Sequence, residues 1–121
     1  VLLHCGPQDR GVANAVCEQV KNPLVRSMGE WHDLPLSLSV AVISQATVVV
    51  SSDSGPRHIA AALDRKVVSL FGPTIPQRTQ TFNVVETTIE SFHECRPCYK
   101  SECPLKHHHC MRSIEVDTVR V

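Results

Sequence analysis

Short apolar runs alternate with amphipathic segments along the chain, and this alternation constrains the fold more than any other feature. The expected strands lie at 1–5, 24–25, 47–51, 66–71 and within 81–89. The expected helices lie at 9–20, 36–45, 56–63 and 114–121, with Ser113 as the cap of the last. Strands that alternate with helices predict an α/β fold, in which helices cover both faces of a parallel sheet.

The segment 36–45 fits two kinds of element. Leu36, Leu38, Val40 and Val42 alternate as in a strand, whereas Leu36, Val40 and Ile43 share one face of a helix. A strand follows almost at once, and a parallel strand needs a crossover before it. We therefore expect a helix here.

Composition excludes several function classes. The chain has 121 residues, and its 12 basic and 12 acidic side chains cancel, so the sequence predicts no whole-surface attraction to nucleic acid or anionic lipid. It holds no apolar run near 18 residues, so we expect no membrane span, and no signal peptide is recognisable. The chain is therefore expected in a reducing cytoplasm, with Cys5 and Cys17 as buried apolar side chains. It begins at Val1 in a strand pattern, and we expect an N-terminal part of a longer protein to be missing.

The stretch SSDSGPRHIAAAL, residues 51–63, carries the candidate site. Asp53 lies just past the end of an expected strand, Ser54 or Gly55 can cap the next helix, and Pro56 suits its first position. The free N–H groups of a first helical turn carry about half a unit of positive charge and form a ready phosphate site. His58 falls in the same turn, where its ring can reach the same anion.

Asp53 has a different expected role. A carboxylate repels phosphate, so Asp53 is predicted to accept hydrogen bonds from neighbouring hydroxyl groups. Phosphate and polyol side by side suggest a nucleotide-sugar. The alternative is a well-capped strand-to-helix turn without a ligand, in which His58 is structural.

Four clustered cysteines form a second candidate site within the segment 93–111. Their spacing is Cys-x2-Cys-x4-Cys-x6-Cys, with histidines nearby as substitute ligands. Four thiolates could hold a structural zinc, and an iron–sulfur cluster fits the ligand count. The alternative is a loop of reduced or disulfide-bonded thiols. The cysteines are Cys95, Cys98, Cys103 and Cys110.

The stretches SSDSGPRHIAAAL, VVSLFGPT and CRPCYKSECPLKHHHCM resemble the C-terminal half of bacterial heptosyltransferases of glycosyltransferase family nine, and the cysteine segment resembles the type II enzymes. The resemblance implies a GT-B architecture of two Rossmann-like domains. The present chain would be the C-terminal one, a single nucleotide-sugar-binding domain over 1–121. An N-terminal acceptor domain with the catalytic base would be absent.

The resemblance also implies roles for individual residues. Asp53 would contact the heptose hydroxyls, and Ser54, Gly55 and His58 would line the diphosphate. Thr74, in the Gly-Pro-Thr loop, would add a hydroxyl near the same group, and Asp9 would bind the nucleotide ribose. Arg57 stands where the family often has an apolar residue. It could be exposed to solvent or could supplement the positive charge near the phosphate, and of the two we expect exposure.

The implied reaction is an inverting transfer of heptose from ADP-heptose to the lipopolysaccharide inner core. The protein would work in the cytoplasm or at the periphery of the inner membrane. No cofactor is expected to be required, and the sequence does not decide whether a divalent ion assists the diphosphate. The isolated fragment is predicted to be inactive. The alternatives are a non-catalytic nucleotide-binding domain and a metal-binding interaction module.

Overall fold

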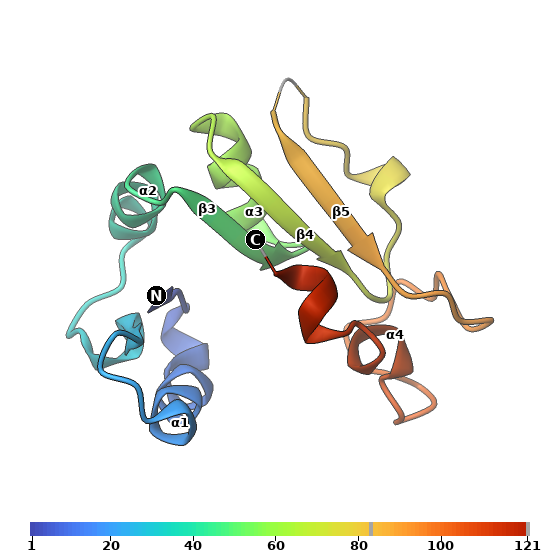
Figure 1. Ribbon diagram of the computed structural model, residues 1–121, viewed down its shortest axis with the longest axis horizontal. Helices are drawn as coiled ribbons and strands as arrows, with labels where there is room; N and C mark the ends of the chain where they lie inside the picture. The colour runs from blue at the N-terminus through green and yellow to red at the C-terminus, as the bar shows by residue number, and fades with distance from the viewer. Residues whose placement is uncertain (83, 121) are drawn as a thin grey trace. The chain divides into compact units, whose positions relative to one another are not determined.

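The computed structural model describes residues 1–82 and 84–120. The chain divides into two compact units, Val1–Ala41 and Val42–Val121, which are described separately below (Figure 1). The expectation of a single domain over 1–121 stays a prediction.

The first unit holds a short two-stranded parallel sheet. Strand β1 (Leu2–Leu3) pairs with β2 (Arg26–Ser27), and the helix α1 (Arg10–Val20) makes the crossover between them. Single 3₁₀ turns lie at Pro7–Asp9 and Met28–Glu30. The first expected strand is confirmed in part, and the second begins two residues later than expected.

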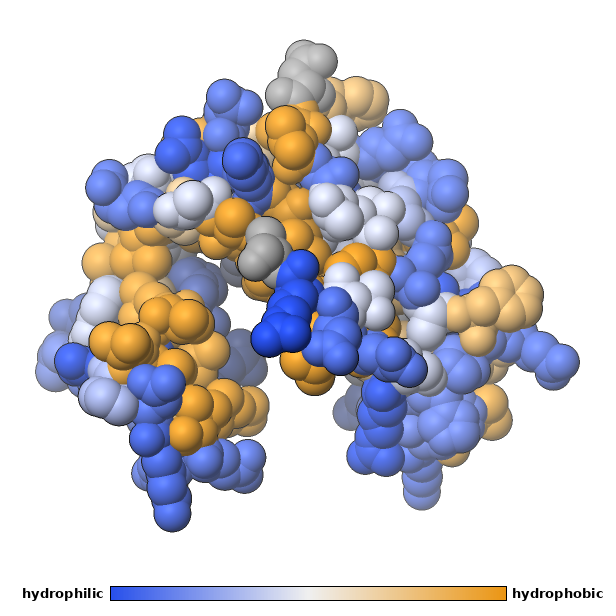
Figure 2. Space-filling view, in the orientation of Figure 1, coloured by the Kyte–Doolittle hydropathy of each residue, from blue (hydrophilic) through white to orange (hydrophobic). Residues whose placement is uncertain are grey.

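Helix α1 confirms the predicted helix, but its apolar face is only partly covered. Lys21 ends the helix in the left-handed conformation and donates its N–H to the carbonyl of Cys17. Ala13 is buried, whereas Val12 is 68% exposed and Val20 is 49% exposed. Figure 2 shows hydrophobic residues at the surface over this helix. Periodicity thus identified the helix, but not how deeply each apolar position is buried. Cys5 is buried as predicted and Cys17 only in part.

The second unit is built on a three-stranded parallel sheet in the order β3-β4-β5. Its strands are β3 (Val48–Ser52), β4 (Lys66–Phe71) and β5 (Glu86–Glu90). Ser51 lies opposite Ser69, and Ser69 lies opposite Thr88. Helix α3 (Gly55–Ala62) connects β3 to β4, and a single 3₁₀ turn, Pro76–Arg78, precedes β5. The predicted α/β class with a parallel sheet is confirmed.

The two faces of β4 pack against different segments. On one face, Val67 belongs to a buried cluster with Ala60 of α3 and Ile43 of α2 (Leu36–Ser44), the helix expected at 36–45. On the other, the space beside Gly72 is filled by Met111, and Figure 1 shows the C-terminal segment in front of the sheet and α3 behind it. Both faces of the central strand are therefore covered, as a parallel sheet requires.

The predicted last helix is wrong. A single helical turn, α4 (His109–Arg112), comes earlier, and a 3₁₀ turn spans Val116–Val119. Ser113 does not open a helix: its backbone N–H and its hydroxyl both bond to the carbonyl of His109, so this residue closes α4. The end of the predicted helix, at 121, lies outside the described residues. No helix in the described part of the chain is long and apolar enough to span a membrane.

Candidate functional site: the N-terminus of α3

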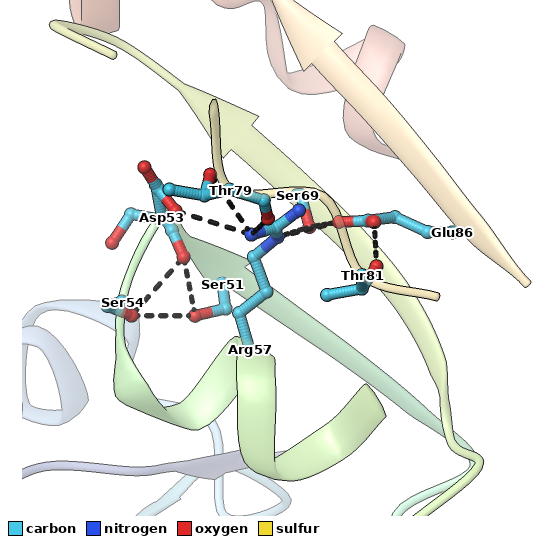
Figure 3. Close-up of polar contacts among 9 residues, drawn as sticks. Ser51, Asp53, Ser54, Arg57, Ser69, Thr79, Thr81 and Glu86 are labelled. Atoms are coloured by element: carbon cyan, nitrogen blue, oxygen red, sulfur yellow. Dashed lines mark hydrogen bonds and ion pairs between the residues drawn. The ribbon is translucent and has the colours of Figure 1, made fainter. Parts of the chain in front are cut away.

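The strand-to-helix turn after β3 leaves the first turn of α3 open. Ser54 is the N-cap residue with an extended backbone, φ −153° and ψ 173°. Its side chain turns away from the helix, and its Oγ lies 3.2 Å from the carbonyl of Ser52 and 3.1 Å from Oγ of Ser51 (Figure 3). Within residues 1–82 and 84–120, no side chain caps this helix. The amide groups that a cap would satisfy are left for another acceptor.

The surroundings of this turn allow an anion to approach. Gly55 is exposed, and a Cβ added there would meet nothing within 4 Å. His58 is also exposed, in the first turn. Pro56 occupies the second helical position rather than the predicted first, because the helix begins at Gly55. The structure thus brings Asp53, Ser54, Gly55 and His58 together at the carboxyl end of β3.

Arg57 is not exposed, and the expectation for it is wrong. Its side chain is 1% exposed and is paired with charged and polar groups. Nη1 donates to Oδ1 of Asp53 at 3.3 Å and to the carbonyl of Thr79 at 2.7 Å, and Nε donates to Oε1 of Glu86 at 2.7 Å. The guanidinium also lies 4.9 Å from the centroid of the Phe71 ring. The buried position is stable because the charge is paired and hydrogen-bonded.

Glu86 is a site residue that the sequence did not indicate. Its carboxylate also accepts hydrogen bonds from the hydroxyls of Ser69 and Thr81. Burial acts to raise the pKa of Glu86, but the hydrogen bonds from Arg57, Ser69 and Thr81 outweigh it and the pKa is lowered. Glu86 therefore holds Arg57 as an ionised partner.

The Gly-Pro-Thr loop after β4 lies at the same edge of the sheet as the turn after β3, because parallel strands end at one edge. Arg96 clamps this loop by donating to the carbonyls of Gly72 and Thr74. Oγ1 of Thr74 is buried and has no hydrogen-bond partner among the described residues. The predicted contact between this hydroxyl and a diphosphate stays a prediction.

Asp9 belongs to the first unit, whereas the residues of this site belong to the second. It lies in the 3₁₀ turn Pro7–Asp9, and its side chain is exposed. Its proposed contact with a ribose stays a prediction.

The four clustered cysteines are free thiols that line one cavity of about 180 Å³. The backbone amide of His108 and, more weakly, those of residues 105–107 lower the pKa of the Cys103 thiol against a smaller effect of desolvation. Burial raises the pKa of Cys110, and the neighbouring Cys95 and Cys98 add to this effect. Within the described ranges, no three His, Cys, Asp or Glu side chains are placed so that they could hold a metal ion. The zinc site stays a prediction.

The parallel sheet, its crossover helix and the polar turn at the strand end define the class of open α/β domains, which bind ligands at the carboxyl edge of the sheet. The family model of glycosyltransferase family 9 (heptosyltransferase) matches residues 1–109. The chain belongs to this family.

Individual relatives agree with this family. Lipooligosaccharide heptosyltransferase 2 of Campylobacter jejuni is 26% identical over 98% of this chain and 38% of its own length. The Haemophilus influenzae protein of the same name is 35% identical over 69% of the chain and 23% of its own length. Lipopolysaccharide heptosyltransferase 1 of Pseudomonas aeruginosa is 39% identical over 58% of the chain and 20% of its own length. The chain therefore spans at most about two fifths of the length of these relatives. No solved structure shows a significant match.

Proposed function

We propose that this chain is the donor-binding part of an inverting glycosyltransferase that moves heptose from ADP-heptose to the inner core of lipopolysaccharide. The family and the names of its relatives support heptose transfer in general. The observation that carries the proposal is the uncapped N-terminus of α3 at the carboxyl end of β3, with the Asp53 carboxylate beside it.

The diphosphate of the donor binds the first turn of α3 in this proposal. Negative charge grows on the leaving diphosphate as the bond to the sugar breaks. Amides that already point at the phosphate stabilise this charge without reorganising. Gly55 lets the phosphate approach the backbone, and the exposed His58 adds a hydrogen bond or a positive charge.

The sugar of the donor binds beside Asp53, whose carboxylate accepts hydrogen bonds from the heptose hydroxyls. The proposal assigns no residue of this chain as the base that deprotonates the acceptor. We place that base, and the acceptor contacts, in another part of the full-length protein, and we expect residues 1–121 alone to transfer no sugar. The reaction is proposed to take place in the cytoplasm, at the periphery of the inner membrane.

The direct test is transfer of heptose by the full-length protein, together with its affinity for ADP. Wild-type protein is expected to transfer heptose to a core acceptor and to gain thermal stability as ADP is added. His58→Ala is expected to lower kcat on the order of 10-fold or more while the melting temperature stays unchanged. His32→Ala, at an exposed position in the first unit, is the matched control. A protein that binds ADP but transfers no sugar would favour a non-catalytic nucleotide-binding domain.

The second candidate function is a metal-binding interaction module, and the observation behind it is the cavity lined by the four cysteines. Metal analysis of freshly purified protein tests it. About one zinc per chain, lost when Cys95 and Cys98 are both replaced by serine, would support a structural zinc. Freshly purified protein that holds no metal would contradict this candidate function and would mean that the four cysteines are plain thiols.

A further inference from the structure

Arg57 links the proposed sugar-binding carboxylate to the start of β5. Figure 3 shows its guanidinium between the side chains of Asp53 and Glu86, with Thr79 close by. Asp53 lies one helical turn before Arg57, whereas Glu86 is 29 residues away in the chain. The link from Asp53 through Arg57 to Glu86 therefore depends on the folded sheet and not on the local turn alone.

The two carboxylates do not hold Arg57 equally. Glu86 makes the shorter contact, 2.7 Å from Nε, and is itself fixed by the hydroxyls of Ser69 and Thr81. The contact between Nη1 and Asp53 is longer, at 3.3 Å. Glu86 and the carbonyl of Thr79 thus anchor the guanidinium, and the anchored guanidinium in turn orients Asp53.

This arrangement also changes the charge beside the phosphate site. An unpaired carboxylate next to the first turn of α3 would repel a diphosphate. The buried Arg57 compensates the charge of Asp53 and leaves Oδ2, the oxygen that Arg57 does not contact, as an acceptor. The side chain of Asp53 is 11% exposed, so its contact with Arg57 is largely shielded from solvent.

We propose that Arg57 is a positioning residue, which holds Asp53 where it accepts hydrogen bonds from the donor sugar, and that Glu86 keeps Arg57 in place. This inference rests on the proposed function. It deepens that function because it assigns part of the recognition of the sugar to two residues that do not touch it. A merely structural Arg57 would instead hold Thr79 and Glu86 against α3 with no particular effect on the sugar.

A double-mutant cycle on the full-length protein separates these roles. The readout is the ratio of the dissociation constants for ADP and ADP-heptose, which reports recognition of the sugar and does not require turnover. Asp53→Asn and Arg57→Lys are each expected to reduce this ratio about tenfold, since each weakens a hydrogen bond to a charged group. The double variant is expected to lose no more than Asp53→Asn alone. The dissociation constant for ADP itself is expected not to rise in either single variant, because Arg57→Lys keeps the positive charge and Asp53→Asn removes a negative one.

Arg65→Lys, in the turn between α3 and β4, is the matched control and is expected to leave the ratio unchanged. Glu86→Gln loosens Arg57 without removing it, and it replaces Arg57→Lys in the cycle if that variant does not fold. Losses that multiply in the double variant, or an ADP affinity that falls with the ratio, would overturn the inference and leave the proposed function standing. A wild-type protein that neither binds ADP nor transfers heptose would contradict both the proposed function and the inference about Arg57.

Discussion

Two arginines organise two neighbouring regions of the second unit in different ways. Arg57 is 1% exposed and is bound mainly by side chains, the carboxylates of Asp53 and Glu86. Arg96 is 8% exposed and donates mainly to backbone carbonyls, those of Gly72, Thr74 and Ser91, with Glu90 as its one carboxylate partner among the described residues.

This difference indicates what each region requires of the sequence. The hydrogen bonds of Arg57 join α3 to β4 and β5. They are made mainly to side chains, so they are lost when a partner residue is replaced. Arg96 holds irregular chain, the Gly-Pro-Thr loop and the start of the cysteine segment, where backbone carbonyls need donors. Pro73 supports the same junction, because its carbonyl accepts the amides of Cys98 and Tyr99. Substitution of Arg57 should therefore destabilise the whole second unit. Substitution of Arg96 should destabilise only the loop and the cysteine segment that it holds.

The largest effect is expected for Arg57→Ala. The change leaves the buried carboxylates of Asp53 and Glu86 without their cation, which costs about 3–5 kcal/mol in the free energy of unfolding. Urea unfolding of the full-length protein measures it. The control is Arg120→Ala, which breaks an exposed pair with Asp117 and should cost less than about 1 kcal/mol. A loss below about 1 kcal/mol for Arg57→Ala would mean that the hydrogen bonds of Arg57 are not a source of stability.

Arg96→Ala is expected to cost less, about 2–3 kcal/mol, since it removes charge-assisted hydrogen bonds to the carbonyls. The loss should be local. Hydrogen exchange is expected to accelerate over residues 91–110 and to change little in α3 and β4. The control is Arg112→Ala, an exposed position in α4. Faster exchange spread evenly over the unit would show that the two regions do not unfold separately.

Two glycines sharpen the comparison further. A Cβ at Gly72 would overlap with Sδ and Cγ of Met111, so Gly72→Ala is expected to cost about 1–2 kcal/mol by overpacking. The space beside Gly55 is open, so Gly55→Ala should change the free energy of unfolding by less than about 1 kcal/mol. It should nevertheless weaken ADP binding, because the methyl group lies where the phosphate approaches. Equal losses of stability in thermal unfolding would contradict this contrast.

The smallest effect concerns pH. The pKa of Glu86 is lowered in the folded protein from its usual 4.5. The unfolded chain therefore binds more protons near this pH, and the stability from Glu86 is present above about pH 4.5 and is lost as the pH falls through the folded pKa. Unfolding of Glu86→Gln and wild type, compared between pH 3 and pH 6, measures it. The difference between the two should shrink toward acid pH, and a constant difference would contradict the lowered pKa.

The fold could be read from the sequence largely because its signals are local. Strand β4 lies at the predicted residues 66–71, and α2 was distinguished from a strand by the need for a crossover. The last helix was misplaced because a serine can close a helix as well as open one, and the sequence does not show which carbonyl Ser113 will meet.

The candidate site was predictable only in its local part. The turn from Asp53 to His58 follows from the motif, whereas the ion pair between Asp53, which precedes α3, and Arg57 within it was not predicted. Glu86 was not predicted either, because it reaches Arg57 through the pairing of β4 with β5. Burial of an arginine depends on such distant partners, and its exposure was therefore predicted wrongly.

A structure of the full-length protein with a non-hydrolysable ADP-heptose analogue tests the central claim most directly. We predict that the pyrophosphate accepts hydrogen bonds from the first-turn amides of α3 and that a sugar hydroxyl donates to Asp53. An analogue bound at another place, with those amides occupied by groups of the protein itself, would contradict the account.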